Sequence, residues 1–294
     1  MRPKYSDKLF VAANSAVLVL LAVICVYPFY YVVCASFSMP GELMKNNGLL
    51  FLPAGGFTLK GYELVFDHPN LITAYRNTLL YVISITAANL LFTSIAAYVL
   101  SRRDVKYVKY LMVMMVVTMY FSGGLIPTYI LINSLGILDT PLAIVLPSLL
   151  SAWNTIILRT AISGIPEGIV ESAKIDGAKD MRILFQIMIP LLKATLAVIA
   201  LMVAVGVWNS WFAPMIYLRN PEYFPISLLL RQILILNTVD AMSDYHNISQ
   251  TRGEMYKRLI QYAVTVVATF PILCLYPFIQ KYFVKGVMLG SIKA

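Results

Sequence analysis

The stretch SGIPEGIVESAKIDGAKDMRILFQIMIP, residues 163–190, is a polar segment set between long apolar runs. Pro166 favours a helix start, because the first turn of a helix does not need the N–H that proline lacks. Glu167 near this start and Lys174 near the end suit the helix dipole. Gly177 then favours a stop, since glycine takes the left-handed cap conformation without a Cβ clash. The pattern predicts a short helix that ends in a glycine turn.

A second short helix is predicted to follow the turn. Asp180 is suited to cap its start and Pro190 to end it. Apolar residues at helical spacing give it one apolar face: Ile183, Leu184, Ile187 and Met188. We therefore expect two short helices joined by a glycine turn outside the bilayer, a shape suited to docking on another protein.

The composition is that of a polytopic membrane protein. Of 294 residues, 60% are hydrophobic and 13% are charged, whereas soluble domains carry roughly 25% charged residues. The net charge of +9 comes from basic residues that cluster at the ends of apolar runs, where they set topology. No motif for binding nucleic acid is present, and we expect membrane lipid and no nucleic acid as surroundings.

Six apolar segments lack Asp, Glu, Lys and Arg and are long enough to cross a bilayer, which takes about 20 residues. They are residues 9–33, 77–100, 110–133, 141–158, 194–218 and 259–280. The first is too long for a signal peptide and is predicted to be retained. In the third, Ser122-Gly123-Gly124 and Pro127 are expected to loosen or kink the helix, either as a close-packing site or as a moving hinge.

Basic residues predict the orientation. They lie near the amino end, after the second span, in the 163–190 loop and in the tail: Arg2, Lys4, Lys8, Arg102, Arg103, Lys106, Lys109, Lys174, Lys179, Arg182, Lys193, Lys281, Lys285 and Lys293. Because cytoplasmic loops carry the excess of Lys and Arg, both termini and the loop are predicted to be cytoplasmic. The longer loops 34–72 and 219–257 then face outward.

The loop also resembles a known motif. Glu171-Ser172-Ala173, Gly177, Ile187, Ile189 and Pro190 follow the pattern EAA-x3-G-x9-I-x-L-P of ATP-binding-cassette importer permeases, with Ser for Ala and Ile for Leu. Ile175-Asp176-Gly177-Ala178 is similar to the variant typical of carbohydrate importers of the maltose-permease type. Residues 51–66, 121–140, 218–234 and 282–294 resemble the same family, closest to its oligosaccharide and uronide branch.

The resemblance implies an all-α type I importer permease fold with six transmembrane helices, as one domain over residues 1–294 in the bacterial inner membrane. It implies a heterodimer with a second permease subunit, two ATPase subunits that bind Mg-ATP, and an extracytoplasmic solute-binding protein. The substrate would be an oligosaccharide of plant or algal polysaccharides, including uronic-acid types. The residues themselves do not distinguish a charged sugar from a neutral one.

Two sets of site residues follow. The resemblance assigns ATPase coupling to Glu171, Ser172, Ala173, Asp176, Gly177, Ala178, Phe185, Ile187 and Pro190. A second set is expected to line the substrate pathway, since amides within spans need polar partners and aromatic faces stack on sugars: Asn154, Trp208, Asn209 and Trp211. The alternative for such residues is interhelical hydrogen bonding worth about 0.6 kcal/mol, which we favour for Asn89.

Two other classes of function are weighed against this one. An ion-coupled secondary carrier usually places charged residues within its spans, and these spans have none. A membrane enzyme is disfavoured because HExxH, GxSxG and paired intramembrane carboxylates are missing. The chain has no P-loop, its three cysteines lack CxxC spacing and its two histidines are isolated, so neither a cofactor nor a metal is expected in it.

Overall fold

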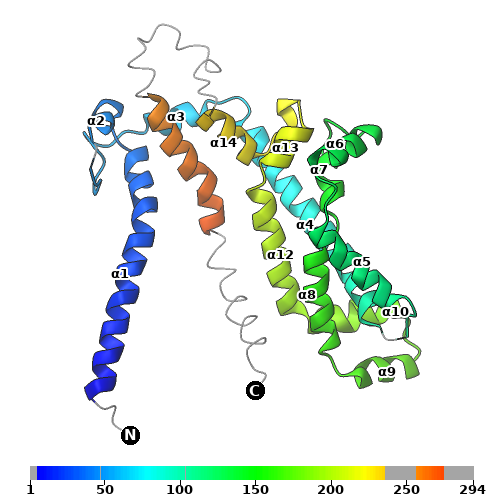
Figure 1. Ribbon diagram of the computed structural model, residues 1–294. Helices are drawn as coiled ribbons and strands as arrows, with labels where there is room; N and C mark the ends of the chain where they lie inside the picture. The colour runs from blue at the N-terminus through cyan, green and yellow to red at the C-terminus, as the bar shows by residue number, and fades with distance from the viewer. Residues whose placement is uncertain (1–4, 47, 103, 236–255, 275–294) are drawn as a thin grey trace. The chain divides into compact units, whose positions relative to one another are not determined.

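The computed structural model describes residues 5–46, 48–102, 104–235 and 256–274. All regular structure in these ranges is helical (Figure 1), as the all-α class predicted. Among the described residues, four helical stretches are long and apolar enough to cross a membrane, and counting two bent pairs as spans raises the number to six. The chain divides into two compact units, Met1–Leu71 with Leu230–Pro271 and Ile72–Leu229 with Ile272–Ala294. We call them the first and the second unit.

In the first unit, α1 (Tyr5–Ser36) contains the predicted first span. Only 6% of its most apolar window is buried in the chain, and side chains such as Val17, Leu20 and Ile24 are exposed. An exposed apolar surface of this length fits lipid surroundings, in which such side chains need no protein partner. The other described residues therefore leave most of the apolar surface of this helix uncovered.

Two short helices and the last described helix belong to the first unit, which also includes the end of α14 (Ile226–Ile235). They are α2 (Pro40–Lys45), α3 (Lys60–Phe66) and the helix Tyr256–Cys274. Their core contains Cys34, Ala35, Leu43, Leu50 and Leu259. The predicted sixth span begins in this helix, while residues 275–280, the tail 282–294 and part of the last outer loop, 236–255, lie outside the described residues.

The second unit begins with the long helix α4 (Leu71–Ser101), which contains the predicted second span. The helices α5 (Val108–Tyr120) and α6 (Leu125–Ser134) follow it, bent by 112° relative to each other. The predicted third span is therefore not one helix. The sequence Ser122-Gly123-Gly124 interrupts it, because two successive glycines are poor helix formers.

The fourth predicted span also contains an irregular stretch. It comprises α7 (Leu142–Val145), the 3-10 turn η1 (Leu146–Ser148) and α8 (Ala152–Ser163). Pro147 lies in this turn, and the Oγ of Ser151 accepts a hydrogen bond from the backbone N–H of Asn154 at 3.3 Å, which caps α8.

The fifth predicted span contains a helix break. Helix α12 (Lys193–Trp208) ends fifteen residues after it begins, and the short helix α13 (Phe212–Tyr217) follows a break at Asn209-Ser210. The apolar segment 194–218 is therefore not one helix, because α12 ends at Trp208. The turn η3 (Pro221–Tyr223) and α14 (Ile226–Ile235) come next, and the chain passes within α14 from the second unit to the first.

Candidate functional site

The polar stretch folds as two helices, as predicted. Helix α9 (Glu167–Ile175) begins directly after Pro166. A second helix, Asp180–Leu191, is built from α10 (Asp180–Arg182), the π-helical η2 (Ile183–Met188) and α11 (Ile189–Leu191). We call these two helices the loop helices. The second meets α12 at an angle of 85°, so the segment forms an elbow at the end of the bundle (Figure 1).

The turn between the loop helices has the geometry of a Schellman motif. The N–H of Ala178 donates to the carbonyl of Ala173 at 2.9 Å, and the N–H of Gly177 donates to that of Lys174 at 3.0 Å. Gly177 has a φ of 79°, the left-handed conformation that glycine adopts at this position. The predicted glycine stop is confirmed.

The loop helices differ in how firmly they are packed. In the second, Ile183, Leu184 and Met188 are almost fully buried against Tyr98 of α4 and Leu158 of α8, so the predicted apolar face is confirmed. In α9 only Ala173 is buried. The second loop helix is therefore anchored by apolar packing, whereas α9 is held by few apolar contacts.

The residues assigned to coupling lie mostly on the exposed side of this elbow. Ala173 is buried and Ala178 and Ile187 are half-buried, while the others are exposed: Glu171, Ser172, Asp176, Gly177, Phe185 and Pro190. Ile175, at the end of α9, is 86% exposed. An exposed face that combines apolar and charged side chains on an anchored element is suited to bind another protein.

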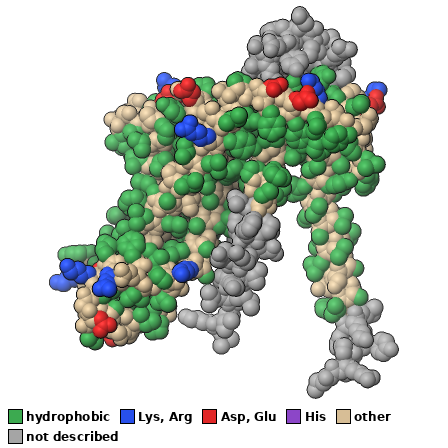
Figure 2. All heavy atoms as spheres, turned by 180° about the vertical axis from the view of Figure 1, so that it is seen from behind, with side chains coloured by type: hydrophobic (Ala, Val, Ile, Leu, Met, Phe, Trp, Pro, Cys, Tyr) green, Lys and Arg blue, Asp and Glu red, His purple; other side chains and the backbone are tan. Residues whose placement is uncertain are grey.

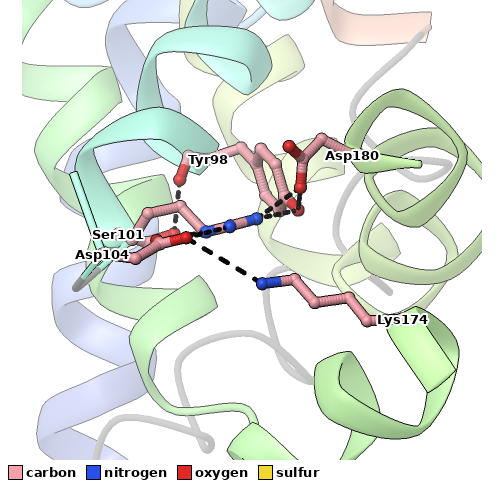
Figure 3. A network of polar contacts seen from close by, with 6 residues as sticks. Tyr98, Ser101, Asp104, Lys174 and Asp180 are labelled. Atoms are coloured by element: carbon pink, nitrogen blue, oxygen red, sulfur yellow. Dashed lines mark hydrogen bonds and ion pairs between the residues drawn. The ribbon is translucent and has the colours of Figure 1, made fainter. Parts of the chain in front are cut away.

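Beside the loop helices, a polar network joins them to the end of α4 (Figure 3). Arg102 donates to both carboxylate oxygens of Asp104, with the Nε contact at 2.8 Å, and to the carboxylate of Asp180. It also donates to the Tyr98 hydroxyl at 3.0 Å, which itself donates to Asp180 at 3.1 Å. Lys174 of α9 lies 3.9 Å from Asp104. The network thus reaches both loop helices.

The role predicted for Asp180 is corrected by this geometry. Its side chain makes no capping hydrogen bond, and Lys179 occupies the cap position of the helix. The carboxylate faces Arg102 and Tyr98 instead, because an ionised guanidinium is a stronger donor than a backbone N–H. Asp180 therefore contributes a contact between segments and not a local cap.

The charges of the network favour its ionised form. The Arg102 guanidinium lowers the pKa of Asp104 to about 2, and hydrogen bonds to Asp104 raise the pKa of Arg102 above its usual value. A carboxylate with a lowered pKa stabilises the fold above its ordinary pKa and loses this effect only as the pH falls towards the lowered value. The network is therefore intact at neutral pH.

A cavity of about 510 Å³ lies next to the network. Its walls come from the ends of α4 and α8 and from α9, and include Tyr98, Arg159, Ile162, Glu167, Val170 and Lys174. Since Val170 and Lys174 belong to α9, this helix does not fill the space between itself and the bundle.

Two buried amides lie within the spans. The Nδ2 of Asn89 in α4 donates to the carbonyl of Ser148 at 2.9 Å, and the Nδ2 of Asn154 in α8 donates to the Oδ1 of Asn89 at 3.3 Å. The interhelical role that we favoured for Asn89 is confirmed. Asn154 shares this contact and is 7% exposed, so its polar group faces α4.

The other residues assigned to the pathway gather at the break between α12 and α13. Trp208 is buried beside Tyr75, with ring centroids 6.4 Å apart. Asn209 is exposed, and its Nδ2 donates to the carbonyl of Val205 at 2.9 Å. Trp211 is half-buried, with its ring perpendicular to that of Phe212. The accessible members of the set are therefore Asn209 and Trp211.

At its other end, α4 holds the segment that follows α13. Asn77 donates to the carbonyl of Glu222 at 2.6 Å, and the Tyr81 hydroxyl donates to that of Tyr223 at 2.9 Å. Thr78 accepts from the N–H of Ile226 at 2.7 Å. The helix therefore has polar ties near both of its ends. Within the described residues, no group of His, Cys, Asp and Glu side chains is arranged to hold a metal ion.

Residues 91–289 match the family described as binding-protein-dependent transport system inner membrane component. The chain is 38% identical to a polygalacturonan/rhamnogalacturonan transport system permease protein, YtcP, of Bacillus subtilis (strain 168), over 98% of this chain and 99% of the relative. It is 35% identical to protein LplC of the same organism, over 98% of this chain and 96% of that relative.

A solved structure has the same fold. It is a bacterial ABC transporter involved in the import of the acidic polysaccharide alginate, with a TM-score of 0.84 and 27% identity over 96% of this chain and 99% of that one. The likeness covers nearly the whole of both chains.

Proposed function

Since the chain belongs to the family of binding-protein-dependent transport system inner membrane components, we propose that it is the permease subunit of an ATP-driven importer for acidic oligosaccharides. It is a transport subunit and not an enzyme, as its relatives are permease proteins. ATP hydrolysis is carried out by partner ATPase subunits that bind Mg-ATP, and this chain pairs with a second permease in the inner membrane.

The observation that carries the coupling role is the exposed elbow on an anchored base. The second loop helix is fixed to the bundle by Ile183, Leu184 and Met188, while the Gly177 turn and the assigned coupling residues remain exposed. An ATPase subunit that binds this face transmits its movement to the bundle through packed side chains. The loop residues named for coupling act in this way and do not take part in chemistry.

The orientation is part of the proposal. Cations gather at the end of the second unit that carries the loop helices (Figure 2): Arg102, Lys106, Lys109, Arg159, Lys174, Lys179 and Arg182. Because cytoplasmic ends of membrane proteins carry the excess of Lys and Arg, this end faces the cytoplasm and the ATPase. The segment after α13 faces outward, towards an extracytoplasmic binding protein.

The acidic substrate class rests on the relatives, whose names refer to polygalacturonan, rhamnogalacturonan and alginate. Asn209 and Trp211 are the residues of this chain that we place in the sugar pathway, since both are accessible at the break after α12. Asn154 and Trp208 are buried, so we assign them a role in packing around the pathway and not in contacting the sugar.

The experiment measures sugar uptake into liposomes that contain the purified complex of this chain, the second permease and two ATPase subunits. The binding protein is supplied outside the liposomes. Uptake of a uronic-acid oligosaccharide is expected to require ATP and to persist when ionophores remove all ion gradients. A neutral oligosaccharide of equal length serves as the control for the substrate class. Uptake driven by an ion gradient without ATP would instead establish a secondary carrier.

A further inference from the structure

Arg102 lies where the end of α4 meets both loop helices. Through Asp180 it contacts the first turn of the second loop helix, and through Asp104 it approaches Lys174 of α9. These two contacts lie on either side of the Gly177 turn. Arg102 therefore contacts the element after the turn directly and the element before it through Asp104; Figure 3 shows Asp104 and Asp180 beside Lys174.

The contacts of Arg102 are expected to stabilise the structure more than an ordinary surface ion pair does. Exposed pairs contribute little because both side chains must be ordered in water. The Arg102 side chain is only 16% exposed, although its partners Asp104 and Asp180 are 57% and 60% exposed. It binds Asp104 through two parallel contacts, and such bidentate pairing fixes the direction of the guanidinium.

The cavity explains why α9 needs this connection. The helix buries only Ala173, and a space of about 510 Å³ separates Val170 and Lys174 from Tyr98 and Ile162. Apolar packing leaves α9 room to tilt towards the bundle. The polar ties limit this tilt, since Lys174 faces a carboxylate whose position Arg102 sets.

We propose that Arg102 is a positioning residue that fixes both loop helices to the end of α4, so that the three elements move together. The inference rests on the proposed function, in which an ATPase subunit pushes on the loop helices. Without the contacts of Arg102, part of the movement of the ATPase subunit tilts α9 into the cavity and does not move α4. ATP is then hydrolysed with less sugar moved.

The test compares variants of the assembled complex. Arg102→Gln is expected to lower the sugar transported per ATP about tenfold, the effect of losing a hydrogen bond to a charged group. Arg102→Lys is expected to fall in between, because it keeps the charge and loses the bidentate geometry. Lys106→Gln is the matched control, since Lys106 is an exposed cation of the same turn outside the network, and its ratio is expected to stay that of the wild type.

Asp180→Asn provides a second variant in case Arg102→Gln fails to assemble, and it is expected to lower the same ratio. An unchanged ratio in the assembled variants overturns the proposal. So does a fall that Lys106→Gln reproduces, because the effect then comes from charge alone. Loss of subunits in proportion to loss of transport overturns it as well, by assigning Arg102 a role in stability.

A measurement that does not depend on transport separates this inference from the proposed function. Backbone hydrogen exchange over residues 167–178 is expected to rise about tenfold in Arg102→Gln, with α12 unchanged. If the wild-type complex shows no ATP-driven uptake, the proposed function fails while this result still decides whether Arg102 holds α9. Equal exchange in variant and wild type removes Arg102 as the tie.

Discussion

At Gly177 the backbone has a φ of 79°, and a Cβ built there would meet no heavy atom of the described residues, apart from its two chain neighbours, within 4 Å. A side chain at this position costs roughly 1–2 kcal/mol of backbone strain, and its Cβ does not clash with the described residues. We therefore expect Gly177→Asp to leave insertion and pairing with the second permease intact. In the complex, the added bulk faces the ATPase, so transport is expected to be uncoupled from ATP hydrolysis or the ATPase to be released.

Gly136 provides a matched control for this prediction. It follows α6 as Gly177 follows α9 and has a φ of 69°, and a Cβ built there also meets no described atom within 4 Å beyond its chain neighbours. Gly136→Asp therefore carries the same backbone strain away from the loop helices. Transport, ATPase activity and subunit composition are measured on each purified complex. Normal coupling of ATP hydrolysis to transport in Gly177→Asp would contradict the proposed role of the Gly177 turn in binding the ATPase. So would an equal loss of the ATPase subunit from both variants.

At the scale of the element, the break between α12 and α13 separates two tryptophans with different surroundings. Trp208 is 7% exposed, whereas Trp211 lies half-buried beyond the break. We expect Trp211→Ala to reduce sugar uptake about fivefold, the effect of losing one aromatic contact of about 1 kcal/mol, while the complex assembles normally. Asn209→Leu is expected to act in the same direction.

Trp208→Ala is the comparison for this pair, because truncating a buried ring leaves a cavity and lowers stability. Its main effect is expected in the thermal unfolding temperature of the complex, measured in parallel with uptake. If Trp211→Ala lowers the unfolding temperature as much as it lowers uptake, Trp211 packs between helices and does not line the pathway.

At the scale of the whole molecule, α4 has polar ties at both ends. Asn77 and Tyr81 hold the segment after α13, and the network around Arg102 holds the loop helices. A helix of 31 residues spans about 46 Å at 1.5 Å per residue, enough to cross a bilayer. Helix α4 thus connects the side we assign to the binding protein with the side we assign to the ATPase.

Labelling of single cysteines tests this orientation. In a chain whose Cys25, Cys34 and Cys274 are replaced by Ala, Met181→Cys is expected to react only from the cytoplasmic side. Glu222→Cys is expected to react only from outside. Both parent side chains are exposed, so access is not limited by burial. Labelling from the opposite sides would reverse the orientation that the basic residues predict.

The sequence by itself determined the helical membrane class, the two loop helices, the glycine turn and the family. These features depend on local signals: apolar runs, helix caps, and a motif whose residues are close together in the chain. The break at Ser122-Gly123-Gly124 was indicated in the same way. The sequence did not indicate where α12 ends or how long α13 is, because uninterrupted apolar composition does not reveal where a helix ends.

Only the tertiary structure decided what Arg102, Asp180 and Asn154 do. Arg102 and Asp180 are 78 residues apart in the sequence, and Asn154 and Asn89 are 65 apart, so no local pattern pairs them. In the sequence, Arg102 indicated which end faces the cytoplasm, and Lys174 indicated this and the end of a helix. Their contacts depend on how α4, α8 and the loop helices pack, because a charged side chain takes the partner that folding brings within reach.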